Sequence, residues 1–209
     1  MKIGIFGGTF NPPHKGHEKL VSDFLQTLNL DKVMIIPNKK PTHKQCEDLA
    51  FDTDRLEMCR LAFKNPKYEI SSIEIDRSTD SYMIFTIDEI LEKYPSAELY
   101  LIIGADMFLI FHKWYKHREI IEKCKKICVA TRDEEDTIKS LRSYAFEHFK
   151  IYIPELESDK ILLSKAEPFI ISSTNIREKI AKNELITDFV CDDVANYIVK
   201  RGLYGYTKK

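Results

Sequence analysis

The chain opens with Met1-Lys-Ile-Gly-Ile-Phe-Gly-Gly-Thr-Phe-Asn-Pro-Pro-His-Lys-Gly-His17, and the interpretation of the remaining sequence depends on this stretch. Residues 3–6 are apolar and predict a short buried strand, which runs directly into two glycines. Behind the second histidine, apolar residues recur at helical spacing and predict an amphipathic helix: Leu20, Val21, Phe24, Leu25 and Leu28. A strand, a glycine-rich turn and a helix N-terminus, in this order, present backbone N–H groups and the positive end of a helix dipole to a phosphate.

The side chains of the opening stretch also suit a phosphate. Gly7 and Gly8 carry no Cβ, so the backbone can approach a ligand closely. His14 and His17 add side-chain donors that are neutral or charged near pH 7, depending on their surroundings. Each feature alone is an ordinary helix start. Their combination at fixed offsets after a predicted strand indicates a phosphate-binding turn rather than an ordinary helix start.

The composition is that of a globular protein that does not bind nucleic acid. Of 209 residues, 44% are hydrophobic. The chain contains 32 basic and 33 acidic residues, which gives a net charge of −1. No apolar run approaches the roughly 18 residues of a membrane span, and the N-terminus shows no signal-peptide pattern, so we expect no membrane partner. Five scattered cysteines, an odd number, indicate free thiols and a cytoplasmic location.

Alternating strand and helix patterns predict an α/β fold with a doubly wound, mostly parallel sheet. Further strands are expected at residues 32–37, 68–75, 98–103, 126–130, 150–153 and 168–171. Further helices are expected at 52–63 (with Asp52, Thr53 or Asp54 as N-cap), at about 86–94, at 107–111, 133–149, from 172 onward, and at 188–200. No Pro/Gly-rich linker interrupts the chain. We therefore expect one domain over 1–209, in which about 168–209 form the last strand and a small C-terminal helical extension.

Three later segments carry candidate ligand-binding residues. The basic loop 38–44, which includes Lys44, follows a predicted parallel strand; it is either a solvated loop or a phosphate contact, and its position favours the contact. Gly104 and Asp106 follow the predicted strand 98–103, where a carboxylate suits a ribose hydroxyl, although Asp106 also suits a helix N-cap. The stretch Ser172-Ser-Thr-Asn-Ile-Arg177 places hydroxyls, backbone amides and a guanidinium at a helix start, which is a second anion site.

The motif Gly-Gly-Thr-Phe-Asn-Pro-Pro-His-Lys-Gly-His, residues 7–17, resembles the signature of the nucleotidylyltransferase superfamily with the His-x-Gly-His motif. In detail the chain is similar to bacterial nicotinate-mononucleotide adenylyltransferases. The stretches 103–106 (Ile-Gly-Ala-Asp), 113–115 (Lys-Trp-Tyr) and 171–177 (Ile-Ser-Ser-Thr-Asn-Ile-Arg) match the later motifs of that family in order and spacing. The resemblance therefore extends from Met1 to about Tyr204, and it implies a Rossmann-like nucleotidyltransferase fold.

The resemblance also implies roles for individual residues. Those implied to be catalytic are His14, His17 and Arg177. Those implied to bind ATP are Gly7, Gly8, Thr9, Phe10, His14, His17, Gly104, Asp106, Arg132, Ser172, Ser173, Thr174 and Arg177. Those implied to bind the mononucleotide are Lys44, Tyr82, Met83, Trp114 and Tyr115, with the indole stacked on the pyridine ring. The chain departs from the family pattern at three positions. Met83 stands where the family usually has threonine, Phe85 where it usually has aspartate, and Asp133, directly after Arg132, where it usually has proline.

The reaction implied by the resemblance joins ATP to nicotinate mononucleotide and gives nicotinate adenine dinucleotide (deamido-NAD) and pyrophosphate, a step of NAD biosynthesis. Mg²⁺ would enter with the triphosphate, since the sequence shows no carboxylate cage and we expect no metal ligand from the protein. Nicotinamide mononucleotide and phosphopantetheine stay open as acceptors, and a non-catalytic nucleotide-binding module is a further alternative. The sequence also leaves a homo-oligomer open.

Overall fold

The computed structural model describes residues 1–39, 49–132, 135–166 and 172–206. The chain folds into two compact units, each assembled from segments that are distant in sequence. Unit 1 consists of Met1–Gly7, Leu20–Met34 and Tyr82–Pro168, and unit 2 of Gly8–Lys19, Ile35–Ser81 and Phe169–Lys209.

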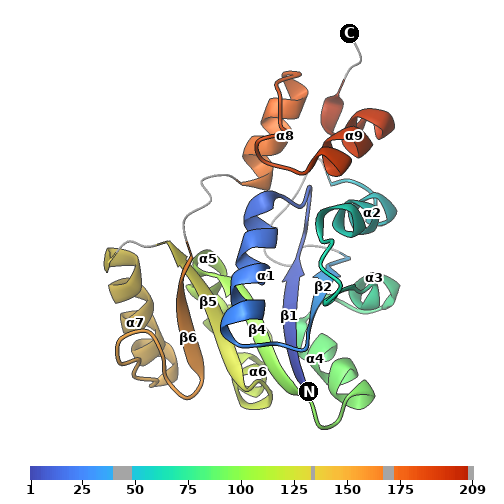
Figure 1. Ribbon diagram of the computed structural model, residues 1–209. Coiled ribbons are helices and arrows are strands. Elements are labelled where there is room, and N and C mark those ends of the chain that lie inside the picture. The colour runs from blue at the N-terminus through green and yellow to red at the C-terminus, as the bar shows by residue number, and fades with distance from the viewer. Residues whose placement is uncertain (40–48, 133–134, 167–171, 207–209) are drawn as a thin grey trace. The chain divides into compact units, whose positions relative to one another are not determined.

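The described strands are β1 (Lys2–Gly8), β2 (Lys32–Pro37), β3 (Tyr68–Ile70), β4 (Glu98–Gly104), β5 (Lys126–Arg132) and β6 (Ile161–Ala166) (Figure 1). The helices are α1 (Lys15–Thr27), α2 (Asp52–Ala62), α3 (Ile73–Asp76), α4 (Met83–Lys93), α5 (Ala105–Phe108), α6 (His117–Lys123), α7 (Glu135–Phe149), α8 (Ser173–Ala181) and α9 (Asp192–Arg201). Two 3-10 turns are η1 (Phe111–Lys113) and η2 (Leu203–Gly205).

The strands form one sheet in the order β3-β2-β1-β4-β5-β6. The pairs β1–β4, β4–β5 and β5–β6 are parallel. This order runs outward in both directions from the centre, as in the Rossmann arrangement, so the predicted doubly wound α/β fold is confirmed.

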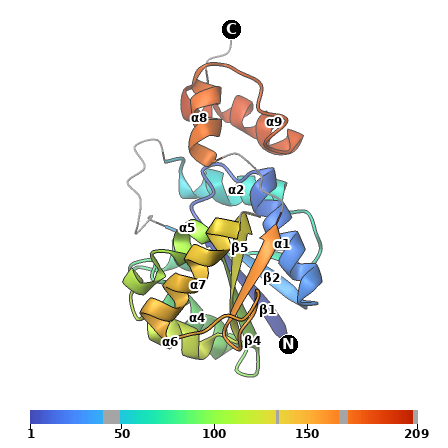
Figure 2. The same ribbon diagram turned by 90° about the vertical axis from the view of Figure 1, so that its left-hand side faces the viewer.

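The sheet strands of unit 1 are buried because they are covered on their faces, which explains their continuous apolar sequence. Ile3 and Ile5 of β1 and residues 99, 101 and 102 of β4 are fully buried. Gly4 is needed for close packing: a Cβ at this position would lie 2.9 Å from Cδ1 of Leu30. In the same unit α5 and α7 pack against β5, and α4 packs against α6 (Figure 2).

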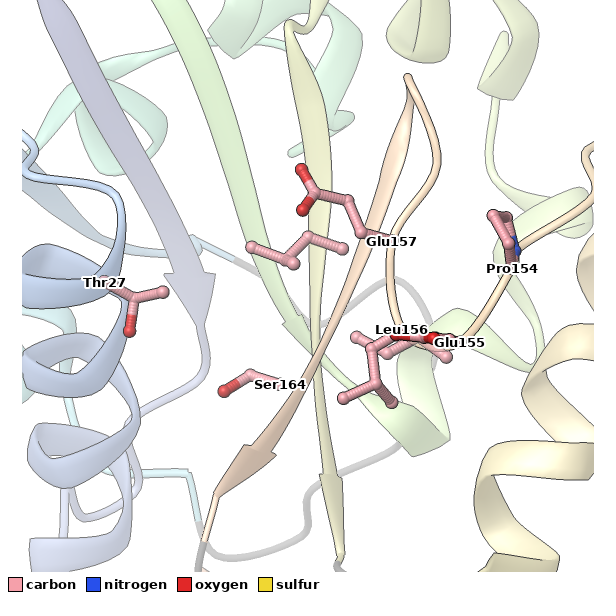
Figure 3. Close-up of a pocket in the computed structure, with 8 residues that line it drawn as sticks. Thr27, Pro154, Glu155, Leu156, Glu157 and Ser164 are labelled. Carbon is pink, nitrogen blue, oxygen red and sulfur yellow. The ribbon is translucent and has the colours of Figure 1, made fainter.

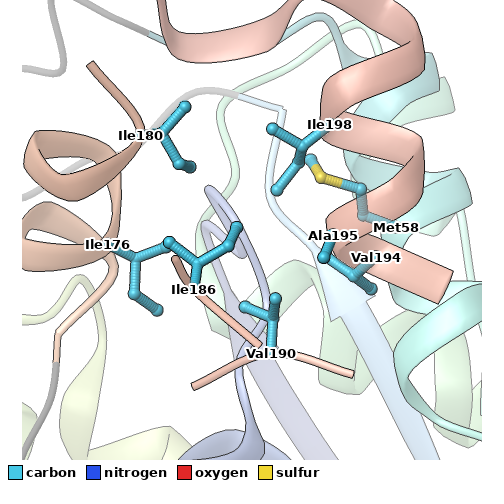
Figure 4. Packing of buried hydrophobic residues seen from close by; sticks show 8 residues of the cluster. All are labelled: Met58, Ile176, Ile180, Ile186, Val190, Val194, Ala195 and Ile198. Carbon is cyan, nitrogen blue, oxygen red and sulfur yellow. The ribbon is translucent and has the colours of Figure 1, made fainter. Parts of the chain in front are cut away.

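Unit 2 has an apolar core of its own, formed by α2, α8, α9 and the segment between the last two helices. Its buried side chains point toward one another (Figure 4): Met58, Ile176, Ile180, Ile186, Val190, Val194, Ala195 and Ile198. The period of these residues along α8 and α9 is that of an amphipathic helix. The C-terminal helices are therefore fixed by packing against α2.

Several predicted boundaries are wrong. The strand expected at 68–75 ends at Ile70, and α3 follows it. No strand forms at 150–153. Lys150 follows the end of α7 with a left-handed φ of 59°, and Ile153 lies in a loop with its side chain buried. The edge strand is instead β6, which pairs with β5 and for which the sequence analysis expected no element.

Helix ends also differ from the predictions. The N-cap of α2 is Phe51, and no side chain caps that helix. Asp106 lies in the first turn of α5, whose N-cap is Gly104, so the N-cap reading of Asp106 is wrong. The closing helix begins at Asp192 rather than 188. The strand expected at 168–171 lies outside the described residues. None of the helices in the described part of the chain combines the length and the apolarity that a bilayer crossing needs.

Candidate active site

The loop of residues 9–14 connects β1 to α1 and carries the first histidine. It is tightly enclosed: Phe10 and Asn11 are each 2% exposed. Phe10 adopts a left-handed φ of 48°, which is uncommon for a residue other than glycine. Its ring packs edge-on against the ring of His17, with centroids 5.2 Å apart. The loop conformation is therefore imposed by its surroundings, and it places the histidines at the start of α1.

His14 and His17 begin α1 with two capping hydrogen bonds, which use both backbones and the side chain of His17. The backbone N–H of His14 donates to Nδ1 of His17 (3.2 Å), and the backbone N–H of His17 donates to the carbonyl of His14 (2.9 Å). The first of these bonds is the return half of a capping box, with an imidazole in the place of the usual Glu or Gln. Because Nδ1 of His17 accepts a hydrogen bond, the ring proton of the neutral imidazole lies on Nε2, which is then a donor.

Burial keeps both histidines neutral. It lowers the pKa of His14 from 6.5 to about 4. The pKa of His17 is also lowered well below its usual value, first by burial and second by the neighbouring His14, whose ring stacks on it at 3.6 Å between centroids. At pH 7 the two rings therefore present neutral N–H donors.

The N-terminus of α8 is the second element expected to bind an anion. Ser172 and Asn175 form a reciprocal capping box, in which the Ser172 Oγ accepts from the Asn175 N–H and Asn175 Oδ1 accepts from the Ser172 N–H. The hydroxyl protons of Ser172 and Ser173 are used within the protein, on Asn175 Oδ1 and on the Pro12 carbonyl. Thr174 is exposed.

Arg177 joins the two helix starts. Its Nη1 donates to the carbonyl of Asn11 (3.0 Å), and Ser173 donates to the next carbonyl, that of Pro12 (2.9 Å). The Nε of Arg177 is buried and finds no acceptor among the described residues. Unit 2 therefore brings together three of the predicted residues, His14, His17 and Arg177, around one loop.

Arg55, to which no sequence motif pointed, is the largest fully buried side chain among the described residues. Its guanidinium donates to the carbonyls of Thr9 (2.8 Å) and Asn38 (2.6 Å) and pairs with the carboxylate of Asp52 (2.5 Å). It thus fastens the loop after β1 to the end of β2. The spacing of Asp52 and Arg55, three residues apart on a predicted helix, was the only sequence sign of this ion pair.

In unit 1, Gly104 and Asp106 lie at the carboxyl end of β4. A Cβ at Gly104 would come 2.7 Å from Oδ1 of Asp106, so the carboxylate folds back over this glycine. Asp106 is exposed. It is not the cap of α5, because it lies within the first turn and the N-cap is Gly104.

Of the residues predicted to bind the mononucleotide, Tyr82 and Tyr115 are aromatic neighbours in unit 1. The rings of Tyr82 and Tyr115 lie 4.9 Å apart, and Phe85 packs against both (6.0 and 5.9 Å). Trp114 follows η1 and packs on Phe111, with centroids 5.0 Å apart. Met83 is the first residue of α4.

The remaining predicted residues are placed as follows. Gly7 and Gly8 are the last residues of β1, so they end the strand instead of forming a turn after it. Arg132 is the last residue of β5. Lys44 lies outside the described residues. An open pocket of about 570 Å³ in unit 1, between Thr27 and residues of β6, contains no predicted site residue (Figure 3).

Metal ligands are not grouped in the described part of the chain: no cluster of three or more His, Cys, Asp or Glu side chains occurs there.

Comparison with known proteins identifies the family of the chain. Residues 5–179 match the model of the cytidylyltransferase-like family. The chain is 35% identical over 205 residues to the nicotinate-nucleotide adenylyltransferase of Bacillus subtilis, covering 97% of this chain and 98% of that protein. It is 38% identical to the probable nicotinate-nucleotide adenylyltransferase of Dictyoglomus thermophilum, covering 98% and 100%.

Solved structures share the fold. The Plasmodium falciparum nicotinic acid mononucleotide adenylyltransferase complexed with NaAD superposes with a TM-score of 0.76 at 17% identity, covering 99% of this chain and 98% of that one. The same enzyme complexed with APC gives a TM-score of 0.72 with the same coverage. The fold, the full-length sequence identity and the family match agree, and the chain belongs to the nicotinate-nucleotide adenylyltransferases of the cytidylyltransferase-like family.

Proposed function

We propose that the protein transfers the adenylyl group of ATP to nicotinate mononucleotide, giving nicotinate adenine dinucleotide and pyrophosphate. The observation that carries this proposal is the joining of two helix N-termini around one loop: the loop before α1 is hydrogen bonded to Ser173 and Arg177 of α8. Two amide-rich helix starts and a guanidinium suit a polyphosphate. The names of the full-length relatives specify the reaction.

The chemistry requires no protein base. A phosphate oxygen of the mononucleotide attacks the α-phosphorus of ATP in line; a new P–O bond forms while the bond from that phosphorus to the β-phosphate bridging oxygen breaks, and pyrophosphate leaves with the electron pair. The nucleophile is already an anion. Catalysis therefore consists of aligning two mutually repelling phosphates and stabilising the charge that develops.

His17 suits the second task. Its Nε2–H is fixed as a donor by the bond that Nδ1 accepts from His14. A neutral donor in a buried site costs little to hold in place, and it gains strength as negative charge builds up on a phosphate oxygen. His14, stacked on it, would donate in the same way.

Arg177 would hold the phosphates while it also holds the loop. Its Nη1 is committed to Asn11, whereas its buried Nε has no protein acceptor in the described chain, and a phosphate oxygen satisfies such a group. At the start of α8 we assign the direct contacts to the exposed Thr174 and to backbone amides. Ser173 would contribute its backbone amide, because the hydroxyl protons of both serines and the N–H of Ser172 are already donated within the protein.

The nucleoside and pyridine contacts are assigned to unit 1. Gly104 and Asp106 suit the ATP ribose, and the indole of Trp114 suits a cationic pyridine ring. Tyr82, Met83 and Tyr115 would complete the mononucleotide site; Met83 offers its backbone N–H but lacks the hydroxyl of the family's threonine. Lys44 and Arg132 stay assigned to phosphate and adenine, respectively. Mg²⁺ would accompany the triphosphate.

A second candidate keeps the chemistry and takes nicotinamide mononucleotide as the acceptor. The observation in its favour is the aromatic group of Tyr82, Phe85 and Tyr115, in which Phe85 replaces the family's usual aspartate. We also propose a cytoplasmic location, which agrees with the free thiols of the buried Cys59, Cys124 and Cys128.

A pyrophosphate-release assay tests the proposal. ATP and Mg²⁺ are supplied with nicotinate mononucleotide, nicotinamide mononucleotide or phosphopantetheine in parallel, and one arm contains EDTA. We expect the highest kcat/KM with nicotinate mononucleotide and no turnover with EDTA. ATP binding without pyrophosphate release from any acceptor would instead support a nucleotide-binding module.

A further inference from the structure

The C-terminal segments of unit 2 hold the loop of residues 9–14 at several points. Two of these, from Ser173 and Arg177 of α8, are described above. Beyond the loop, the backbone N–H of Lys15 donates to the carbonyl of Phe189 (2.8 Å), and its Nζ donates to the carbonyl of Thr187 (2.8 Å). The histidine at 14 is thus fastened on both sides by residues more than 150 positions later in the chain.

The last of these attachments comes from η2, near the end of the described chain. The hydroxyl of Tyr204 donates to Oδ1 of Asn11 across 2.8 Å. Asn11 is almost completely buried, and its carbonyl accepts the bond from Arg177. Both the side chain and the backbone of this one residue are therefore held from the C-terminal part of the chain, three positions before His14.

The loop needs such restraint. Phe10, directly before Asn11, adopts a left-handed φ of 48°, a strained conformation that persists only where the surroundings over-determine it. Tyr204 itself has a left-handed φ of 59°. Its hydroxyl is buried, and burial strongly raises its pKa, so it is a neutral donor at every physiological pH.

We propose that Tyr204 is a positioning residue for the adenylyl transfer: its hydroxyl, through Asn11, fixes the loop that presents His14 and His17. The proposal rests on the proposed function for its catalytic consequence. Tyr204 itself would touch no substrate. Its effect passes along Asn11 to the N-terminus of α1, where the imidazole of His17 is fixed by the backbone N–H of His14.

The effect of removing the hydroxyl follows from this geometry. In Tyr204→Phe, Asn11 Oδ1 keeps the bond from the N–H of Ala50 (3.1 Å), so no buried acceptor is left unsatisfied and the fold is retained. The loop loses one of its restraints. A misplacement of a catalytic donor by about 1 Å costs up to about a hundredfold in rate. We therefore expect kcat to fall about tenfold to a hundredfold, with a much smaller change in the KM for ATP.

Tyr197→Phe is the matched control. The hydroxyl of Tyr197 in α9 also donates to a buried side-chain oxygen, Oδ1 of Asp54 (2.8 Å), which keeps a second bond from Arg201 (2.9 Å). Each variant removes one phenol hydrogen bond from the same unit, and the bond lost in Tyr197→Phe, which goes to a carboxylate, is the stronger of the two. Tyr197→Phe should therefore unfold at a urea concentration no higher than Tyr204→Phe does, whereas kcat should fall in Tyr204→Phe alone.

A second readout does not depend on turnover. The ¹⁵N chemical shifts of the imidazoles report the tautomer, and in the wild-type protein we expect His17 to be protonated at Nε2 only. Tyr204→Phe should show averaging between the two tautomers of His17, whereas Tyr197→Phe should match the wild type. Equal kcat values and unchanged imidazole shifts in both variants would overturn the proposal. A wild-type protein without turnover would contradict the proposed function alone, because the shifts still test the positioning role.

Discussion

Nδ1 of His17 lies 3.2 Å from the backbone nitrogen of His14 and accepts its hydrogen bond. This contact makes the side chain of one motif histidine part of the cap that begins with the other. It fixes the tautomer of His17 and the orientation of its ring, and it explains why the two histidines stand three residues apart at the start of α1.

His17→Ala should reduce kcat by about 10²- to 10³-fold, the typical cost of losing one donor to transition-state charge. The KM for ATP should change little, since the interaction strengthens in the transition state. Steady-state kinetics with varied ATP measures both. His148→Ala is a suitable control, because it removes a half-buried imidazole that stacks on His112 (4.2 Å) in unit 1. Wild-type turnover in His17→Ala would remove this residue from the mechanism.

The stability of the protein should fall in weak acid because of His14. Its folded pKa of about 4 lies below the unfolded value of 6.5, so between these values the unfolded state binds more protons and the free energy of unfolding decreases as pH decreases. Well above pH 6.5, where the imidazole is neutral in both states, the residue contributes no pH dependence. The loss should reach about 2 kcal/mol at pH 5, and His17 adds to it in the same direction.

Urea unfolding at pH 7 and pH 5 measures this loss. In His14→Gln, which has no ionisable side chain at this position, the difference in the free energy of unfolding between the two pH values should shrink by about 2 kcal/mol. An unchanged difference would mean that His14 is not the titrating group.

Arg55→Met should destabilise the protein by about 3–5 kcal/mol, because it removes a buried cation that serves two loop carbonyls and leaves Asp52 without its partner. The control is Arg60→Met in the same helix. Arg60 is 55% exposed and pairs with Glu57, so its loss should cost less than about 1 kcal/mol. Equal unfolding midpoints in urea for the two variants would show that the buried guanidinium does not fasten the loop after β1.

The difference between Arg55 and the motif residues shows what the sequence reveals. The opening strand, the helix behind it and the Ser172 cap are set by neighbours within a few residues, and their pattern is visible locally. Arg55 bonds to Thr9, 46 positions away, and Tyr204 bonds to Asn11, 193 positions away. No local sequence pattern indicates such contacts.

The missed edge strand has a similar cause. Residues 151–153 and 161–166 are both apolar enough for a strand, and the choice depends on which of them pairs with β5. The first segment follows Lys150, which has a left-handed φ of 59°, and it is the second segment, β6, that pairs with β5. The candidate site was found through its motifs, whereas the residues that hold it in place needed the three-dimensional structure.

Gly104→Ala should weaken ATP binding without harming the fold. Gly104 has φ −79°, which alanine adopts freely, but the new Cβ would lie 2.7 Å from Oδ1 of Asp106 and force the carboxylate to rotate. Losing a hydrogen bond to a charged group raises the KM for ATP by about tenfold or more. Asp106→Ala should give a similar KM. If Gly104→Ala kept the wild-type KM, the position of the Asp106 carboxylate would not matter for ATP.

The most direct test of the central claim follows the α-phosphate. ATP labelled at the α-phosphorus is incubated with Mg²⁺ and nicotinate mononucleotide, and the products are separated. The label should appear in a dinucleotide, with one labelled dinucleotide formed for each pyrophosphate released. Label recovered only as ATP, ADP or AMP, with ATP bound but no dinucleotide formed, would contradict adenylyl transfer by this protein.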